Sequence, residues 1–354
     1  MSKASFLVFS CLWAALALSF GVHGFTSTPI ARQKLSFRAS VADNAETSKA
    51  ADATTDSLSL FSPCKINLFL RIIRKREDGF HDLASLFQAV GFGDTLELTN
   101  LDEGEADEFS CNMEGVPVDS TNLVLRALQL MREKTGVQQY FQANLIKQVP
   151  AQAGLGGGSA NAATAMWGAN QLMGNPATLE QMVEWSGDLG SDITFFLSRG
   201  TAYCTGRGEI MDSIDPPLTP GTKLCIVKPN VGLSTPAVFK ALEYDKLSTL
   251  DAKETLLPAF LKGVDTVPDE YFINDLEPPA FSCVPELAAL KDELCQVEGF
   301  QHIMMSGSGT SIFCLGSPAD EAAFLAKFDE RDDVQVFFTE FIDRPEGVWF
   351  ERPN

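Results

Sequence analysis

The stretch Pro150-Ala-Gln-Ala-Gly-Leu-Gly-Gly-Gly-Ser159 has four glycines in five positions and leads directly into an alanine-rich segment. Glycines remove the Cβ atoms that would keep a ligand away from the backbone. Residues 160–173 predict a helix, with Gly174 and Pro176 as stop signals. Such a loop offers free N–H groups and the positive end of the helix dipole, so the sequence predicts a polyphosphate site here.

This loop differs from the two commonest phosphate-binding patterns. It lacks G-x-x-x-x-G-K-[ST], which excludes an ordinary P-loop. Its glycine spacing fits a Rossmann turn only loosely, and Val149-Pro150-Ala151 interrupts any strand before it. A mobile glycine linker is the other alternative, but the helix predicted directly after the loop favours a fixed conformation.

The composition is that of a globular protein with an acidic excess. The chain has 354 residues, of which 45% are hydrophobic, and this suggests one large or two ordinary domains. The formal net charge of −20 argues against a basic nucleic-acid-binding surface. An anionic ligand must therefore be held by local donors, such as those of the glycine-rich loop.

Cysteine and histidine usage limits the possible chemistry. The eight cysteines form no C-x-x-C pair and are scattered through apolar runs, which predicts buried free thiols in a reducing compartment. Only three histidines are present, too few for a multi-histidine metal centre. Neither His81 nor His302 lies in a recognisable hydrolase motif.

The N-terminus predicts a targeting sequence in two parts. Residues 6–20 are mostly apolar and follow Lys3, which indicates a signal peptide over residues 1–24, with a membrane-spanning helix as the alternative. Residues 25–56 carry basic and hydroxyl side chains and no acid before Asp43, which is typical of a transit peptide. Together they resemble the bipartite presequences of algae with secondary plastids and imply import into a plastid (chloroplast) stroma.

The remaining chain predicts two domains of mixed α and β structure. Three prolines in five residues, ending at Pro220, place the boundary between residues 57–217 and 218–354. The first domain is expected to hold a strand or two over residues 60–73, a helix over 122–134 and the glycine-rich loop. Residues 81–90 fit either a helix or a strand. The second domain alternates strands and helices, as an α+β layer does.

Five blocks of sequence stand out in the expected domains. They are PCKINLFL (residues 63–70), DGFH (78–81), the glycine-rich loop, LGSDITFF (189–196) continuing into AYCTGRGE (202–209), and MSGSG (305–309). In this order they resemble the GHMP small-molecule kinases over residues 57–341. Within that family they are most similar to the branch that acts on a cytidine diphosphate-linked methylerythritol, in its plastid form.

This resemblance implies the fold and the reaction. The expected fold is an α+β, two-domain GHMP kinase, with an N-terminal domain like ribosomal protein S5 domain 2 and a ferredoxin-like C-terminal domain. The active site is expected in the cleft between them. The implied reaction is ATP-dependent phosphorylation of the 2-hydroxyl of the methylerythritol unit, with Mg2+, in non-mevalonate isoprenoid biosynthesis. The implied protein is a monomer or homodimer that binds no nucleic acid and, in its mature form, no membrane.

Two charged residues are the expected catalytic pair. Asp192 lies in an otherwise uncharged segment, and a kinase acting on an alcohol needs a carboxylate within reach of the hydroxyl. A helix-capping Asp is the alternative. Lys65 lies in an apolar strand, where a lysine is costly unless paired. The resemblance places it near Asp192, where it would keep the carboxylate ionised and polarise the attacking oxygen. A lysine that reaches solvent is the alternative.

The resemblance also assigns binding residues. ATP is assigned to Pro150, Ala151, Gln152, Ala153, Gly154, Leu155, Gly156, Gly157, Gly158, Ser159 and Ala160, with Ser159 as the candidate magnesium ligand. The substrate is assigned to Asn67, Phe80, His81, Thr235, Phe239, Gly307, Ser308 and Gly309. In this assignment Phe80 and Phe239 stack on the cytosine and His81 bonds its edge. Alternatively, His81 is a surface turn residue and Phe239 belongs to the core.

Some observations leave alternatives open. Asn161 stands where bacterial relatives often carry Asp, which puts a metal-binding role for that position in doubt. Residues 71–76 hold a dense basic cluster, interpreted as a solvated turn or as a site that steers a diphosphate. A non-catalytic GHMP-fold metabolite sensor and a GHMP kinase for another small alcohol are alternative functions. Retention of Lys65 and Asp192 argues against the first, and Phe80-His81 and Phe239 argue against the second.

Overall fold

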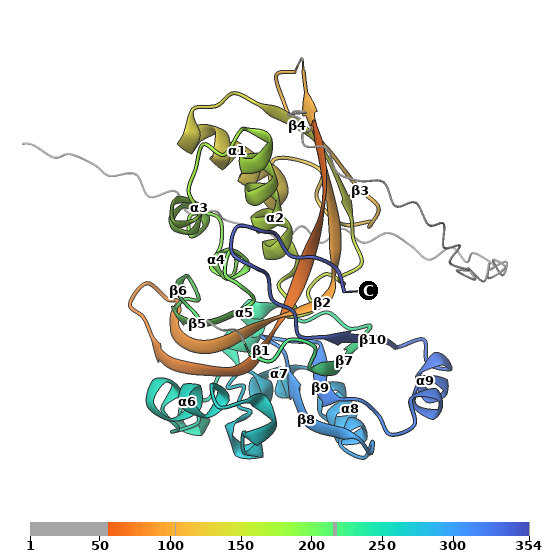
Figure 1. The fold of residues 1–354 in the computed structure, drawn as a ribbon. Helices are drawn as coiled ribbons and strands as arrows, with labels where there is room; N and C mark the ends of the chain where they lie inside the picture. The colour runs from red at the N-terminus through yellow and green to blue at the C-terminus, as the bar shows by residue number, and fades with distance from the viewer. Residues whose placement is uncertain (1–55, 103, 215–217, 354) are drawn as a thin grey trace, which may run out of the picture. The chain divides into compact units, whose positions relative to one another are not determined.

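The structure, a computed structural model, describes residues 56–102, 104–214 and 218–353. The targeting sequence predicted over residues 1–24 and 25–56 lies outside the described residues, apart from Asp56. None of the helices in the described ranges is long and apolar enough to cross a membrane. Two sheets, each with helices against it, make up this part of the chain (Figure 1).

The first sheet is built around one long hairpin. Its strands β1 (Ser57–Lys75) and β2 (His81–Leu101) pair antiparallel along almost their whole length. Strands β4 (Tyr140–Ile146) and β5 (Thr201–Gly206) pair with successive parts of the other edge of β2. Two short strands, β3 (Glu108–Cys111) and β6 (Ile210–Ser213), complete the six-stranded sheet. Residues 81–90, which the sequence left open, are therefore part of a strand.

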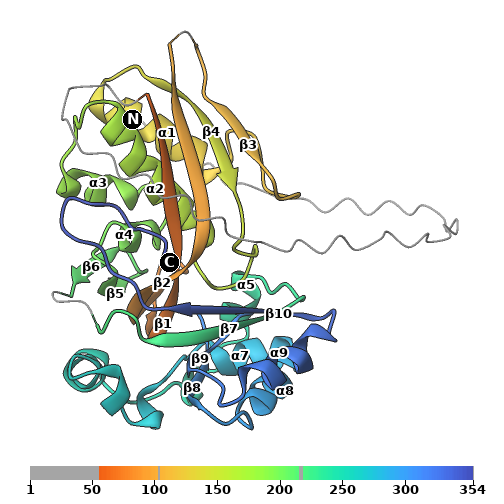
Figure 2. The same cartoon turned by 45° about the vertical axis from the view of Figure 1, so that its right-hand side comes forward.

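Four helices accompany this sheet and lie on one side of the hairpin (Figures 1 and 2). They are α1 (Leu123–Thr135), α2 (Gly157–Leu172), α3 (Leu179–Ser186) and α4 (Ile193–Phe196). The side chain of Asn122 caps α1, and Thr178 and Gln181 form a capping box at the start of α3. Gly168 allows α2 to lie against the hairpin, since a Cβ atom there would come within 2.6 Å of Leu98 Cδ1.

The second sheet has four antiparallel strands in the order β10-β7-β9-β8. The strands are β7 (Lys223–Pro229), β8 (Phe300–Met305), β9 (Ile312–Gly316) and β10 (Val334–Glu340). The helices are α5 (Thr235–Lys240), α6 (Leu257–Phe260), α7 (Glu277–Cys283), α8 (Glu286–Leu294) and α9 (Glu321–Asp329). This order of strands and helices is ferredoxin-like, and the predicted α+β class is confirmed.

Alternating side chains of the second sheet pack against different partners. Cys225 and Val227 of β7 lie in one core with residues of α8 and α9. Leu224 and Ile226 lie in another core, which includes Ile66 of β1. Successive side chains of a strand point to opposite faces of a sheet. The second sheet is therefore buried between its own helices and the β1–β2 hairpin.

The chain then returns to the first sheet. After β10, residues 341–353, here called the C-terminal strap, run back past α4 and α2 (Figures 1 and 2). The Ile342 N–H donates to Ala89 O on β2 at 3.1 Å, and Trp349 Nε1 donates to Phe61 O on β1 at 2.8 Å. Residues that the sequence assigned to the second domain thus pack on the first sheet.

The observed burial of side chains corrects two expectations from the sequence, one on the cysteines and one on Arg71. The seven cysteines in the described chain are free, but Cys283 and Cys295 are exposed, so the prediction that all are buried is wrong. Cys283 is the last residue of α7, and Cys295 is the C-cap of α8. Arg71 does not lie in a solvated turn, because β1 continues past it. It is buried, and its Nε donates to Asp275 Oδ2 at 2.9 Å.

Candidate active site

The glycine-rich loop connects β4 to the start of α2. Gly154 and Gly156 have φ angles of 74° and 69°, which strain any residue with a side chain. A Cβ atom on Gly154 would also lie 2.1 Å from Ser306 O, so the loop packs directly on the second glycine turn. A Cβ atom on Gly158 would meet nothing closer than Leu123 Cδ1 at 3.8 Å, leaving the start of α2 accessible.

The N-terminus of α2 is held differently from those of α1 and α3. Its N-cap is Gly156, and within the described chain no side chain caps it. The first N–H groups of a helix have no partner inside the helix. At α1 and α3 a side chain takes one of them, whereas at α2 they stay available to a ligand.

A cavity of about 440 Å³ lies at this helix start. Ten of the eleven predicted ATP-binding residues line it, namely Pro150, Ala151, Gln152, Ala153, Gly154, Leu155, Gly156, Gly157, Gly158 and Ser159. The eleventh, Ala160, does not, because it is fully buried and its N–H donates to Gly156 O. Ser159 is partly buried and lines the cavity.

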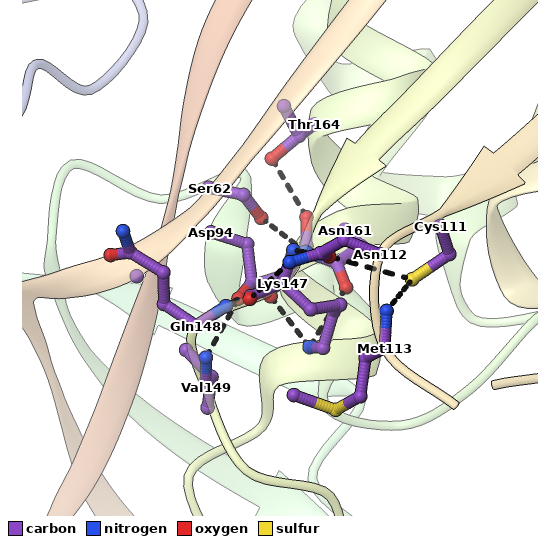
Figure 3. Close-up of polar contacts among 12 residues, drawn as sticks. Ser62, Asp94, Cys111, Asn112, Met113, Lys147, Gln148, Val149, Asn161 and Thr164 are labelled. Carbon is purple, nitrogen blue, oxygen red and sulfur yellow. Dashed lines mark hydrogen bonds and ion pairs between the residues drawn. The ribbon is translucent and has the colours of Figure 1, made fainter. Parts of the chain in front are cut away.

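A buried polar network fixes both ends of the loop (Figure 3). Asp94 on β2 accepts hydrogen bonds from the N–H groups of Gln148 and Val149, at 2.7 and 2.8 Å. Its other oxygen accepts from Lys147 Nζ at 2.6 Å and from Asn161 Nδ2 at 2.9 Å. Because Asn161 belongs to α2, one carboxylate joins the segment before the loop to the helix after it.

The sequence analysis missed Asp94 and Lys147. Each is a charged residue in an apolar strand pattern, as Lys65 is, and this was the available signal. Their pairing could not be seen, because Asp94 and Lys147 are 53 residues apart in the sequence. Lys147 also lines the 440 Å³ cavity. Asn161, whose metal-binding role was in doubt, uses its amide to bond Asp94 and Ser62.

Lys65 and Asp192 face one another in a second cavity, of about 540 Å³. Lys65 Nζ lies 3.8 Å from Asp192 Oδ2 and donates to Asn67 Oδ1 at 2.8 Å. Lys65 is only 3% exposed, which contradicts the alternative of a lysine that reaches solvent. Burial lowers its pKa, and the negative charge of Asp192 opposes that shift.

The side chain of Asp192 opens onto the second cavity. It stands at the N-cap position of α4, yet among the described residues its carboxylate makes no capping hydrogen bond. Its side chain is 36% exposed and lines the cavity. The alternative of a helix-capping Asp is therefore not what the geometry shows.

The second cavity joins the first through shared lining residues. Gln152, Gly154 and Gly156 line both. Its lining also includes Thr235, Phe239, Gly307, Ser308 and Gly309, so the structure brings these predicted substrate residues into the same cavity as the Lys65–Asp192 pair. Thr235 Oγ1 and Ser308 Oγ are hydrogen-bonded at 2.8 Å.

A third cavity, of about 490 Å³, continues from the second and is lined by Phe80, His81 and Phe239. The rings of His81 and Phe239 stack with centroids 4.7 Å apart, and Phe80 is 56% exposed. His81 Nε2 lies 2.7 Å from Tyr244 Oη. Burial and the nearby Lys75 lower the pKa of His81, so its ring is neutral at neutral pH. Tyr244 was missed by the sequence analysis, because no motif marks it.

The three cavities form a series with different chemistry. The first offers helix N–H groups to an anion, the second offers a carboxylate and an ammonium group, and the third offers aromatic rings. No group of three or more His, Cys, Asp or Glu residues that could hold a metal occurs in the part of the chain described. A divalent cation at Ser159 would therefore depend on oxygens of the bound ligand, as Mg2+ sites in kinases do.

Known proteins match both halves of the chain. Residues 122–200 match the family described as GHMP kinases N terminal domain, and residues 265–332 match GHMP kinases C terminal. The chloroplastic 4-diphosphocytidyl-2-C-methyl-D-erythritol kinase of Arabidopsis thaliana is 44% identical over 306 residues, covering 85% of this chain and 78% of that protein. Its counterpart in Oryza sativa subsp. japonica is 46% identical over 298 residues, covering 84% and 73%.

A solved structure matches as well. The crystal structure of a 4-(cytidine 5'-diphospho)-2C-methyl-D-erythritol kinase superposes with a TM-score of 0.66 and 27% identity, covering 81% of this chain and all of that one. The match extends over both sheets, so it includes the elements that carry all three cavities.

The buried network predicts a large stability effect at Asp94. Asp94→Ala removes the partner of a buried lysine and leaves two N–H groups unpaired, so the free energy of unfolding is expected to fall by about 3–5 kcal/mol. Urea denaturation followed by circular dichroism measures this. Asp333→Ala, which removes an exposed ion pair with Arg331, is the control and should change stability little. Equal effects of the two substitutions would contradict a structural role for the network.

Proposed function

Since the chain belongs to the GHMP kinase family, we propose that it phosphorylates the 2-hydroxyl of 4-diphosphocytidyl-2-C-methyl-D-erythritol with ATP, in the non-mevalonate pathway of isoprenoid biosynthesis. The observation that carries this proposal is the series of three cavities with the Lys65–Asp192 pair in the middle one. It matches a substrate with a base at one end and a reacting alcohol at the other. Relatives at 44% and 46% identity bear the name of this kinase.

The glycine-rich loop is the proposed ATP site. ATP supplies the phosphoryl group, and the free N–H groups at the start of α2 hold its phosphates. The open space beside Gly158 and the absence of a cap at Gly156 in the described structure support this assignment. Mg2+ neutralises phosphate charge, and Ser159 is its proposed protein ligand.

Asp192 is the proposed general base. Its carboxylate faces the cavity and accepts the proton of the substrate hydroxyl. Lys65 is the proposed electrostatic partner, because a buried ammonium group stabilises the negative charge that develops on the attacking oxygen. Asn67 orients Lys65 through the 2.8 Å hydrogen bond to its Oδ1.

The third cavity is the proposed cytidine site. Phe80 and Phe239 provide aromatic faces for the base, and a neutral His81 provides a ring nitrogen for its polar edge. Thr235, Gly307, Ser308 and Gly309 are proposed to contact the methylerythritol end, because they line the cavity that holds Asp192.

The proposed location is a plastid stroma. Several relatives are named chloroplastic, and the composition of residues 1–24 and 25–56 supports a signal peptide followed by a transit peptide. The boundary between residues 57–217 and 218–354 is likewise proposed as the division into ATP-binding and C-terminal domains.

ATP turnover with and without the cytidyl methylerythritol substrate tests the function. Substrate-dependent ADP release, with a new phosphomonoester detected by 31P NMR, is expected. Turnover with homoserine or mevalonate in place of this substrate would identify another alcohol kinase and remove the cytidine site. ATP binding without turnover on any alcohol would instead favour a metabolite sensor.

Substitution of the proposed base predicts a specific kinetic loss. Asp192→Asn keeps the side-chain shape but cannot accept the proton, so kcat is expected to fall about 10²–10⁴-fold. Steady-state kinetics at saturating substrates measures this. Asp188→Asn, which alters a nearby exposed residue paired with Lys134, should leave kcat unchanged. A loss of less than tenfold at Asp192 would rule it out as the base.

Substitution of His81 separates the two substrates. His81→Ala is expected to raise KM for the cytidyl substrate about tenfold, the scale of one lost hydrogen bond, and to leave KM for ATP unchanged. Tyr244→Phe keeps the ring but removes the hydroxyl that contacts His81, so it should give a smaller rise of the same kind. Equal increases in both KM values would contradict a cytidine site at His81.

A further inference from the structure

A buried arginine of the C-terminal strap contacts the end of α4, the helix that begins at the proposed base. Arg344 is 1% exposed, and its guanidinium group donates to three carbonyl oxygens. Nε bonds Ser198 O at 2.8 Å, Nη2 bonds Leu197 O at 2.6 Å, and Nη1 bonds Val348 O at 2.8 Å within the strap.

Aromatic rings enclose the same guanidinium group. Its central carbon lies 5.2, 5.4 and 5.5 Å from the ring centroids of Trp167, Trp349 and Phe350. Burial lowers the pKa of Arg344 to about 10, so it keeps its charge at neutral pH. Carbonyl dipoles and ring faces are what balance this cation.

Two of the three carbonyls belong to the end of α4. Leu197 is the C-cap of this helix and Ser198 follows it. The last carbonyls of a helix have no partner inside the helix. Because α4 is a single turn of four residues, it cannot hold its own conformation and depends on contacts at its ends. Asp192 stands at the other end of that turn, about 7.5 Å away by the rise of a helix.

The strap also contacts the elements that carry the glycine-rich loop. Trp349 stacks on Trp167 of α2 with centroids 5.2 Å apart. Arg352 Nη1 donates to Gln148 Oε1 at 3.0 Å, and Gln148 is one of the residues whose N–H group bonds Asp94. One segment of the chain thus touches the supports of both the proposed base and the proposed phosphate site.

We infer that the C-terminal strap positions the active site, and that Arg344 holds Asp192 at its distance from Lys65 by fixing the C-terminal end of α4. Arg344 is thus a positioning residue, which lies outside all three cavities and acts through α4. The inference rests on the proposed role of Asp192 as the base. It accounts for a buried charged side chain that stability alone does not require, because a hydrophobic residue at a buried site is often as stabilising as an ion.

Arg344→Ala and Arg344→Lys in the full chain test this inference. A misplacement of the base by about 1 Å costs on the order of 10²-fold, so kcat is expected to fall about 10- to 100-fold while both KM values stay within about twofold. Arg344→Lys keeps the charge but lacks the planar guanidinium group that bonds several carbonyls at once. It replaces the alanine variant in this test if that variant fails to fold. Millimolar guanidinium ion should partly restore kcat of Arg344→Ala.

Arg132→Ala is the matched control. Arg132 is also largely buried, pairs with Asp107 and lies over the ring of Tyr140, but its contacts line none of the three cavities. It should lose thermal stability and keep kcat at temperatures where the protein is folded. If Arg344 variants lose stability in the same way and keep kcat, the positioning role is overturned.

Hydrogen exchange separates this inference from the proposed function. Amides of residues 189–200 should exchange at least about tenfold faster in the Arg344 variants than in wild type or Arg132→Ala. Unchanged exchange would overturn the inference, whatever the substrate. Absence of turnover in the wild-type protein would overturn the proposed function, and the exchange of α4 would still decide whether Arg344 fixes that helix.

Discussion

The start of α2 has to keep its first N–H groups free of protein partners while the backbone around it is held in place. Such groups are costly to bury without a partner, so a ligand site of this kind is stable only if its surroundings are rigid. The four glycines permit the turn, and the carboxylate of Asp94 takes up the donors on either side of it. Trp167, farther along α2, is in turn packed against the strap. These contacts of the first sheet and the strap thus support one row of N–H donors at the start of α2.

The second constraint is the charge of Lys65. A buried ammonium group needs a compensating partner, and the structure offers one at 3.8 Å, near the limit of an ion pair. A closer pair would leave the carboxylate fully engaged with the lysine. At this separation Asp192 stays partly exposed, and Asn67 takes the lysine's direct hydrogen bond. Lys65 thus has two polar partners, while the carboxylate of Asp192 stays open to the second cavity.

The features that were predicted from the sequence are those encoded by a local pattern of residues. The glycine-rich loop, the helix after it and the helix capped at Asn122 all depend on residues a few positions apart. Residues 81–90 stayed ambiguous because their strand is stabilised by pairing with β1 and β5, which periodicity does not reveal. Asp94 with Lys147, and Arg344 with α4, were missed since their partners are 53 and 147 residues distant in the chain. Such pairings exist only once the sheets have formed.

An acidic protein that binds polyanions cannot rely on its overall field, because a net charge of −20 repels them at long range. The two buried lysines that line the cavities are also balanced individually, Lys147 by Asp94 and Lys65 by Asp192. Attraction is therefore confined to donors that a ligand meets only inside the cavities, namely helix N–H groups and partly compensated ammonium groups. In this arrangement the position of the donors inside the cavities, and not the net charge of the protein, selects the ligand. That dependence on placement explains why so much of the chain, including its last residues, contacts the elements behind the site.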